Sequence, residues 1–348
     1  MKQMEALVKD RPGPGASLAK VPVPVCGRDE VLIRVQASSI CGTDLHIYNW
    51  DEWARNTVAV PNVFGHEYAG VVEQVGSEVT NVKPGDYVTS EGHFVCGVCR
   101  ACRTGNAHVC TRTRSFGITV PGCFAEYTVV PASHVIHNHP DLPLKTACLQ
   151  DPLGNAVHTV LAGSIVGKSV AIVGAGPIGL MAIAVAKACG AGTIFAVDVN
   201  GYRLKLAKQM GADIVLNSLE NPDFADPIRS LTDGEGVEVL LEMSGHPGAI
   251  REALSAVANA GRVSLLGIPT KEVPINLAQS IIFKGLRVEG ITGRRMYDTW
   301  YQMKGLLDSG RIDLQPLVTH TFKLEQYEEA FELVRSGQCG KVVFLHEG

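Results

Sequence analysis

Several features that mark specialised classes of protein are absent from this sequence. The 348 residues carry a formal net charge of −4, so the chain has none of the basic excess with which proteins bind nucleic acid or anionic membranes. It has no internal repeats and no low-complexity segments. Hydrophobic residues make up 46% of the chain and charged residues 19%, a composition typical of a folded enzyme rather than of a disordered protein.

The sequence also shows no signal for export or membrane insertion. Its first ten residues lack the apolar stretch of a signal peptide. The segment Ser169–Ala186 is uncharged and nearly as long as a membrane span, but its glycines and Pro177 interrupt it near the middle, where a bilayer helix would be continuous. The ten cysteines are typical of a reducing compartment, where thiols bind metal or pack in a core. We therefore expect a soluble, cytoplasmic protein.

Two patterns of hydrophobicity divide the chain, which is too long for one ordinary core. Up to about residue 150, short β-branched runs separated by glycine, proline and aspartate predict a β-rich domain. From about residue 167, apolar runs alternate with helical patterns, as in a doubly wound domain with a parallel sheet. The predicted strands here are 170–173, 193–197, a short one at Val215, 237–241 and 262–266, and the predicted helices are 180–188, 202–210 and 248–258.

The last part of the chain is predicted to return to the first domain. Helices are expected near 300–307 and 325–336, and the apolar strand 341–345 should rejoin the β-rich part. The predicted fold class is therefore α/β. Residues 1–155 and 295–348 form the β-rich domain, and residues 156–294 form the inserted doubly wound domain.

Four cysteines form the most informative motif, C-x2-C-x2-C-x7-C, at Cys96, Cys99, Cys102 and Cys110. Cysteines three residues apart cannot pair as disulfides without severe strain, but four thiolates at this spacing can surround one tetrahedral ion. Zinc suits four sulfur ligands best, and a closed site of this kind is structural. A loop of free thiols and an iron–sulfur cluster are the alternatives.

A glycine-rich run, Gly174-Ala175-Gly176-Pro177-Ile178-Gly179, lies between a predicted strand and a predicted helix. In this G-x-G-x-x-G motif the first glycine permits the tight turn, the second lets the backbone approach a pyrophosphate, and the third lets helix and strand pack closely. Asp198, 24 residues after Gly174, is placed to accept from ribose hydroxyls and to repel a 2′-phosphate, which predicts NAD rather than NADP. Arg203 counts against the preference for NAD, because a nearby arginine can accommodate the 2′-phosphate of NADP. The alternative to a dinucleotide site is a purely structural turn that tolerates glycine, with Asp198 as a helix cap.

A second metal site of different composition is predicted from Cys41, His66 and Glu67. A thiolate, an imidazole and a carboxylate can bind zinc and leave one position open for water or an alcohol. Asp151 is a further carboxylate at the end of the first domain. Each residue alone is as well explained by burial or an ordinary hydrogen bond. Together with a dinucleotide site they indicate hydride transfer, because a Lewis-acid ion lowers the pKa of the alcohol.

The run Gly65-His66-Glu67-Tyr68-Ala69-Gly70, followed by Gly76 and Val79, resembles the signature of the zinc-containing medium-chain dehydrogenase/reductase family. The cysteine motif, Cys41-Gly42-Thr43-Asp44 and the Rossmann glycines occur in the same order, over essentially the whole chain. The resemblance implies a GroES-like catalytic domain that holds both zinc sites and a Rossmann domain that binds NAD.

The resemblance also implies roles for individual residues. Cys41, His66 and Glu67 correspond to ligands of the catalytic zinc, and the four cysteines to those of the structural zinc. Thr43 and His46 would relay the substrate proton through the cofactor ribose, with Asp151 in the relay or supporting the zinc ligands. The residues that the resemblance assigns to the cofactor, beyond the glycines, are Ile178, Asp198, Arg203, Leu266, Gly267, Ile268, Ile291 and Thr292.

Stretches 46–53, 91–93, 151–159 and 293–300 are similar to those of family members that act on L-threonine. This implies NAD-dependent oxidation of L-threonine to 2-amino-3-oxobutanoate, with His93 and Arg294 as substrate-binding residues and Arg294 pairing with the carboxylate. It also implies a homotetramer. A zinc dehydrogenase for polyols or simple secondary alcohols is the first alternative, and a non-catalytic NAD-binding protein is the second.

Overall fold

A computed structural model describes residues 2–346 of the chain. These residues form two compact units: one contains the chain up to Pro152 and again from Val318, and the other is Leu153–Leu317. Among the described residues, no helix is long and apolar enough to cross a bilayer.

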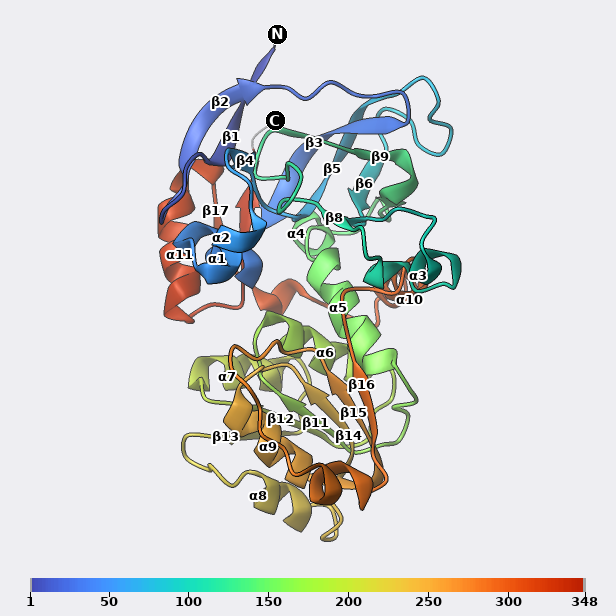
Figure 1. The fold of residues 1–348 in the computed structure, drawn as a ribbon, viewed down its shortest axis with the longest axis vertical. Coiled ribbons are helices and arrows are strands. Elements are labelled where there is room, and N and C mark those ends of the chain that lie inside the picture. The colour runs from blue at the N-terminus through green and yellow to red at the C-terminus, as the bar shows by residue number, and fades with distance from the viewer. Residues whose placement is uncertain (1, 347–348) are drawn as a thin grey trace. The chain divides into compact units, whose positions relative to one another are not determined.

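The first unit is built around a mixed sheet with the strand order β10-β6-β5-β3-β18-β17, in which β9 also pairs with β3 (Figure 1). Its central strand β3 pairs with β5, β9 and β18, and one of its faces is apolar and buried, with Val31, Ile33, Val35 and Ala37, whereas the other carries the partly buried Arg34 and Gln36. The strands are β3 (Glu30–Ser39), β5 (Glu67–Val75), β6 (Tyr87–Ser90), β9 (Tyr127–Pro131), β10 (Val135–His137), β17 (Val318–Phe322) and β18 (Lys341–Leu345).

Smaller elements complete this unit. A three-stranded sheet has the order β2-β1-β4, and β7 pairs with β8 at the base of the cysteine loop. Phe64, Phe124 and Phe331 are buried together in the core, where Phe64 meets Phe124 edge-on at 5.2 Å. The remaining strands are β1 (Gln3–Lys9), β2 (Ser17–Pro22), β4 (Asn62–Val63), β7 (His93–Phe94) and β8 (Arg114–Ser115). The helices are α1 (Gly42–Asn49), α2 (Glu52–Thr57), α3 (Arg100–Arg103), α4 (Leu144–Ala147), α11 (Tyr327–Ser336) and 3-10 turns at Ala107–Val109, Ala132–His134 and Leu324–Gln326.

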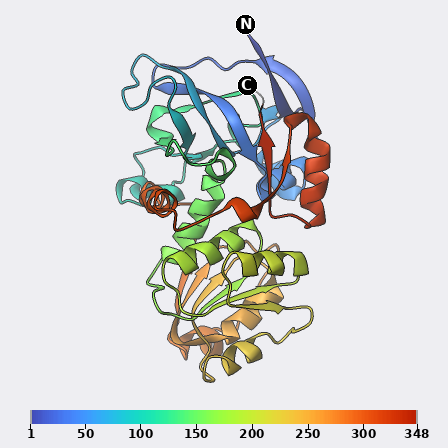
Figure 2. The same ribbon diagram turned by 180° about the vertical axis from the view of Figure 1, so that it is seen from behind.

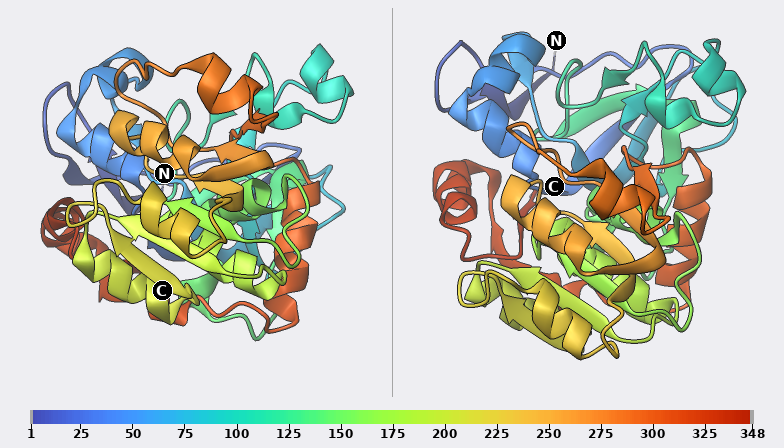
Figure 3. Two further views of the ribbon diagram at one scale, coloured as in Figure 1. Left: turned by 90° about the horizontal axis from the view of Figure 1, so that it is seen from below. Right: turned by 60° about the horizontal axis from the view of Figure 1, so that its bottom comes forward.

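The second unit is a parallel six-stranded sheet with the order β13-β12-β11-β14-β15-β16, the doubly wound arrangement that binds dinucleotides. Helices α6 and α7 cover one face and α8 and α9 the other, as the opposite views of Figures 1 and 2 show, and Figure 3 shows the sheet between these layers. The strands are β11 (Val170–Val173), β12 (Ile194–Asp198), β13 (Ile214–Asn217), β14 (Val237–Glu242), β15 (Val257–Leu265) and β16 (Arg287–Gly290). The helices are α6 (Pro177–Ala188), α7 (Gly201–Gln209), α8 (Ala225–Ser230), α9 (Pro247–Ser255), α10 (Asp298–Asp308), a π-helical turn Ala278–Ile282 and a 3-10 turn Gln315–Leu317; α5 (Gln150–Leu161) begins in the first unit and ends here.

The predicted strands and helices of both domains are present, and 341–345 pairs with β3 as expected. The predicted helix 248–258 was too long, because α9 ends at Ser255 and residues 257 and 258 already belong to β15. The compact units divide the chain differently from the prediction in two segments, of which the shorter is 153–155, predicted for the first domain but part of the second unit. Residues 295–317, predicted to belong with the first domain, group with the second unit. The guanidinium of Arg294 lies 5.5 Å from the ring centroid of Trp300 in α10, and the turn Gln315–Leu317 packs on α7, which ties this segment to the Rossmann part.

Candidate active site

The four cysteines of the predicted structural site converge in a loop between β7 and β8. Their Sγ atoms lie within 4.8 Å of one another, with separations such as 3.5 Å between Cys99 and Cys102. Backbone N–H groups point at the sulfurs, as from Cys99 to Cys96 at 3.4 Å. Hydrogen bonds from the backbone, first that of Val98, lower the pKa of Cys96 to about 6. Burial and the neighbouring sulfurs instead raise the pKa of Cys102 to about 12, so a bound cation would be needed to keep all four sulfurs as thiolates, as in a closed zinc site.

Cys41, His66 and Glu67 also meet at one point. One donor atom from each lies within 4.8 Å of the others, although the residues come from two separate parts of the chain. Cys41 precedes α1 as its N-cap, whereas His66 and Glu67 stand at the start of β5. This group of three unlike donors does not include Asp151.

Asp44 supports two of these ligands from a fully buried position. Its Oδ2 accepts a hydrogen bond from the backbone N–H of Cys41 at 2.8 Å, and its Oδ1 lies 3.5 Å from Nδ1 of His66. Burial disfavours a charge on the imidazole, but Asp44 and Cys41 together raise the pKa of His66 above its ordinary value. The two atoms lie at ion-pair distance but make no hydrogen bond among the described residues, so Asp44 acts on the imidazole through its charge, from the side on which a carboxylate commonly supports a histidine that binds metal. The sequence contained Asp44 in its motif but did not indicate this role.

Lys341 and Ser39 hold Glu67 from the other side. Both contact Oε2 of Glu67, and Lys341 also donates to the carbonyl of Ile40 at 2.7 Å. Strand register explains the meeting, because Ser39 of β3 lies opposite Glu67 of β5 and also opposite Val343 of β18. Burial disfavours the charged amine, but the Glu67 carboxylate raises the pKa of Lys341 above its ordinary value, so that the lysine stays charged. No signal in the sequence marked Lys341 as part of the site.

The second carboxylate oxygen of Glu67, Oε1, bears on whether Cys41, His66 and Glu67 bind a metal ion. Oε1 is buried and has no hydrogen-bond partner among the described residues, while Oε2 is held by two partners. A buried carboxylate oxygen without a partner is costly, and a cation would satisfy it. The donor set of thiolate, imidazole and carboxylate therefore fits a zinc ion with an open position.

The predicted proton-relay residues lie on two helices of the same unit. Thr43 and His46 are in α1, and Oγ1 of Thr43 lies 3.8 Å from Sγ of Cys41. Nδ1 of His46 lies 2.5 Å from Oδ2 of Asp51, and the ring meets Trp53 edge-on at 6.0 Å. Asp151 lies in α5. Its Oδ1 points towards Gly92, since a Cβ built on Gly92 would lie 3.7 Å from that oxygen.

The two predicted substrate residues lie in different units. His93 is in β7, where Nδ1 lies 2.6 Å from Oε1 of the buried Glu91. Arg294 is only 1% exposed and its stem packs on Gly154 of α5, where a Cβ would come within 2.2 Å of its Cδ. The sequence did not indicate that His93 contacts Glu91 or that Arg294 packs on Gly154.

The glycine motif forms the turn between β11 and α6. Gly174 has φ of +99°, a conformation that side chains disfavour, and Gly176 is the N-cap of α6. A Cβ at Gly179 would lie 1.9 Å from the carbonyl oxygen of Gly174, whereas a Cβ at Gly176 would meet nothing within 4 Å. Gly179 thus permits helix and strand to pack, and the open space at Gly176 leaves the helix N-terminus free for an anionic ligand.

A cavity of about 730 Å³ extends from this turn along the second unit. Asp198 at the end of β12 and Arg203 of α7 both line it. The carboxylate of Asp198 accepts from the backbone N–H groups of Ala175 at 2.7 Å and Asn200 at 2.8 Å, so it is fixed beside the glycine turn. Nε of Arg203 is buried without a hydrogen-bond partner among the described residues.

The remaining predicted cofactor residues follow the next two strands. Leu266, Gly267 and Ile268 come after β15, and Ile291 and Thr292 after β16. Glu242, which the sequence did not single out, braces this region from the end of β14: Oε1 accepts from the backbone N–H of Ser244 at 2.9 Å, and its carbonyl accepts from Gly267 at 3.1 Å. The predicted residues thus gather at the carboxyl ends of the parallel strands, where doubly wound domains bind their ligands.

Comparison with known proteins places this architecture in a family. The zinc-binding dehydrogenase family matches residues 177–309, and the alcohol dehydrogenase GroES-like domain matches residues 27–141. An L-threonine 3-dehydrogenase of Bacillus licheniformis is 54% identical over 98% of this chain and 99% of its own, and one of Pyrococcus horikoshii is 52% identical over 99% of each. The crystal structure of galactitol-1-phosphate dehydrogenase from Escherichia coli superposes with a TM-score of 0.89 at 29% identity, covering 98% of this chain and 100% of that one.

The chain belongs to the zinc-containing medium-chain dehydrogenase/reductase family. It is an NAD-dependent oxidoreductase that acts on CH–OH groups. The family resemblance, the GroES-like and Rossmann fold class and the dehydrogenase activity predicted from the sequence are thereby confirmed.

Proposed function

We propose that this protein oxidises the secondary alcohol of L-threonine to give 2-amino-3-oxobutanoate, with NAD as the hydride acceptor. The observation that carries the chemistry is the convergence of Cys41, His66 and Glu67, with one carboxylate oxygen buried and unpartnered. The substrate follows from identities of 50–54% over nearly the full length of several curated L-threonine 3-dehydrogenases.

The proposed mechanism assigns a distinct task to each cofactor-binding region. Cys41, His66 and Glu67 would hold a zinc ion, which would act as a Lewis acid and lower the pKa of the substrate hydroxyl, and bound NAD would be the hydride acceptor. Asp44 and Lys341 keep the ligands in place. The N-terminus of α6 binds the pyrophosphate and Asp198 the ribose, so that NAD is preferred over NADP.

The substrate proton leaves through groups on α1 in this proposal. Oγ1 of Thr43 would accept the substrate proton as its own hydroxyl proton leaves, the cofactor ribose would link it to His46, and the exposed His46 would release a proton to solvent. Asp51 holds Nδ1 of His46, which directs Nε2 outward for the transfer. Asp151 supports the zinc ligands or the relay, His93 contacts the substrate, and Arg294 pairs with its carboxylate.

A substrate panel tests the proposal directly. NADH formation is followed with L-threonine, D-threonine, L-serine, sorbitol and 2,3-butanediol, each with and without a strong chelator. We expect chelator-sensitive turnover confined largely to L-threonine. Preference for sorbitol or the diol would retain the zinc chemistry and overturn the amino-acid substrate.

We further propose that each chain holds two zinc ions, one in each site. Metal analysis should give two zinc ions per chain in the wild type and one in each of the single variants Cys102→Ser and Cys41→Ser. Cys102→Ser should lower thermal stability, because a closed site contributes folding energy, whereas Cys41→Ser should chiefly abolish turnover. A single ion in the wild type would contradict the second site.

Substitutions at Asp51 separate its two contacts. Asp51 caps α2 by accepting from the backbone N–H of Ala54 at 3.0 Å, and it also holds His46. Asp51→Asn should retain stability to within about 0.5 kcal/mol, because asparagine caps as well as aspartate, yet lower turnover about tenfold by releasing the histidine. Asp51→Ala should in addition lose about 1 kcal/mol of unfolding free energy. Wild-type turnover in Asp51→Asn would exclude a role for the pair.

We propose a homotetramer located in the cytoplasm. The four residues of β16, at the edge of the parallel sheet, are all exposed, and an exposed strand edge invites pairing with another chain. Light scattering coupled to gel filtration should give four times the chain mass of 37.2 kDa.

A further inference from the structure

Glu242 is a buried carboxylate that the proposed mechanism does not use. It is the last residue of β14 and is fully buried, and it does not line the cavity that extends from the glycine turn. It makes no ion pair within 4.0 Å among residues 2–346. A buried carboxylate is costly unless it is hydrogen-bonded, so its partners show what it holds in place.

The carboxylate of Glu242 holds the loop that follows β14. Oε1 accepts from the backbone N–H groups of Ser244 at 2.9 Å and Gly245 at 3.1 Å, and also from the hydroxyl of Ser244. The same loop lies directly against the glycine turn, because a Cβ at Gly174 would come within 2.7 Å of the backbone nitrogen of Ser244. Met243 and Ser244 line the cavity. Glu242 therefore fixes a wall of the cavity that it does not itself line.

The main chain of Glu242 connects this loop to a second one, which follows β15. Its carbonyl oxygen accepts from the N–H groups of Leu266 at 2.9 Å and Gly267 at 3.1 Å. The backbones of the two loops are in contact, since a Cβ at Gly267 would lie 2.2 Å from the nitrogen of Gly245, and a Cβ at Gly245 would lie 2.6 Å from the carbonyl oxygen of Ile268. A displacement of one loop therefore displaces the other.

The order of the strands indicates which part of NAD these loops meet. The carboxyl ends of β12, β11, β14 and β15 follow one another across the sheet. Asp198 ends β12 and the glycine motif follows β11, so in the proposed mechanism the adenosine half and the pyrophosphate lie over these two strands. A dinucleotide extends across the switch point of such a sheet to the strands on its other side. The nicotinamide half then lies over the loops after β14 and β15.

We propose that Glu242 is a positioning residue for NAD, which holds these two loops in the conformation that receives the nicotinamide half. This role rests on the proposed placement of NAD at the glycine turn. Without the carboxylate, the N–H groups of the first loop lose their acceptor, and the loops populate other conformations. Binding must then restore the competent conformation, which weakens the apparent affinity for NAD. AMP lacks the nicotinamide half, so its binding does not depend on these loops.

The test compares NAD with AMP by calorimetry on the zinc-loaded protein. Glu242→Ala should bind NAD at least about tenfold more weakly, since a hydrogen bond to a charged acceptor contributes about that factor or more. Its affinity for AMP should fall by less than about threefold. Glu242→Gln, whose amide oxygen can still accept from the loop, should keep both affinities within about threefold of the wild type.

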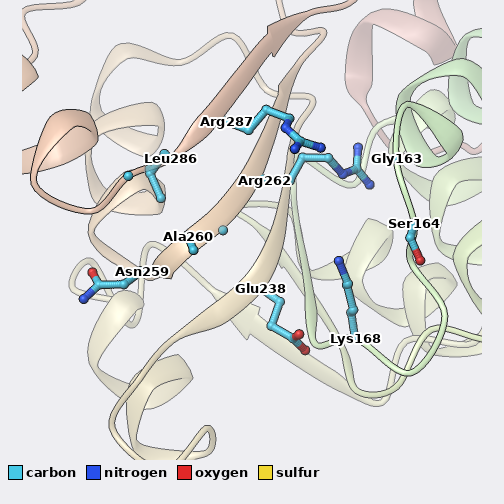
Figure 4. Close-up of a pocket in the computed structure, with 11 residues that line it drawn as sticks. Gly163, Ser164, Lys168, Glu238, Asn259, Ala260, Arg262, Leu286 and Arg287 are labelled. Carbon is cyan, nitrogen blue, oxygen red and sulfur yellow. The ribbon is translucent and has the colours of Figure 1, made fainter.

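Gly245→Ala reaches the same displacement by another route, which keeps the test informative if Glu242→Ala fails to fold. An added Cβ forces the two loops apart and leaves Glu242 in place, so the same selective loss of NAD affinity is expected. The matched control is Glu238→Ala. Glu238 lies near the amino end of β14 beside a separate hollow (Figure 4), where it also accepts from a backbone N–H, that of Ser169 at 3.0 Å. This control should keep the wild-type affinity for both ligands.

Three results would overturn the positioning role. They are equal weakening of NAD and AMP in Glu242→Ala and Gly245→Ala, wild-type NAD affinity in both, and a loss in Glu242→Gln as large as in Glu242→Ala. Absence of saturable NAD and AMP binding in the wild type would overturn the placement of NAD itself, and the role of Glu242 with it.

Discussion

Replacing Lys341 by methionine is expected to cost about 3–5 kcal/mol of unfolding free energy, because it leaves the buried carboxylate of Glu67 without its charged partner. Lys341 and Glu67 are 2% and 0% exposed as side chains, so water cannot replace the lost contact. The same change should weaken zinc binding at the open site and lower kcat, since Oε2 of Glu67 is no longer held away from the other ligands. Urea denaturation, metal analysis and turnover are the three measurements.

A double variant separates stability from catalysis. In Lys341→Met/Glu67→Gln the buried charge is removed together with its partner, so most of the lost stability should return, whereas activity should not. Lys341→Arg is the conservative control that keeps the charge. Full recovery of turnover in the double variant would show that Glu67 is not needed at the metal, and a wild-type denaturation midpoint for Lys341→Met would show that the pair contributes nothing.

Alanine at Gly176 and alanine at Gly179 are expected to fail in different ways. A Cβ at Gly179 would lie 1.9 Å from the carbonyl oxygen of Gly174, so Gly179→Ala should destabilise the protein by about 3 kcal/mol or more through overpacking. A Cβ at Gly176 meets no protein atom within 4 Å but occupies the space in front of the helix N-terminus. Gly176→Ala should therefore keep its stability and lose at least about tenfold in NAD affinity, or ~1.4 kcal/mol.

Thermal denaturation without NAD, followed by titration of NAD monitored by fluorescence, distinguishes the two variants. Gly201→Ala is a suitable control, because a Cβ there also meets nothing within 4 Å and the residue lies outside the predicted glycine motif. Unchanged NAD affinity in Gly176→Ala would argue that the pyrophosphate does not lie at this turn.

The parts of the site that were predictable are those whose geometry is local. The four cysteines lie within fifteen residues, and their spacing alone limits how the sulfurs can meet. The glycine motif and Asp198 belong to successive elements of one strand–helix–strand unit, so their positions follow from the pattern of the fold. The segment 295–317 was less predictable, because its helical pattern does not say which core it packs on.

By itself, the sequence determined the family and the fold class, and it singled out the two groups of candidate metal donors that the structure brings together, because residue type and spacing restrict these directly. Only the tertiary structure decided what holds the donors. Lys341 is 274 residues from Glu67 in the chain and reaches it solely because β18 and β5 flank β3, and Asp44 acts on His66 only because α1 begins beside β5. Arg262 and Arg287 are neighbours for the same kind of reason, since β15 and β16 pair in parallel in a register that places the two residues side by side. Contacts made through sheet pairing leave no periodic signal, so they become visible only when the strands are assembled.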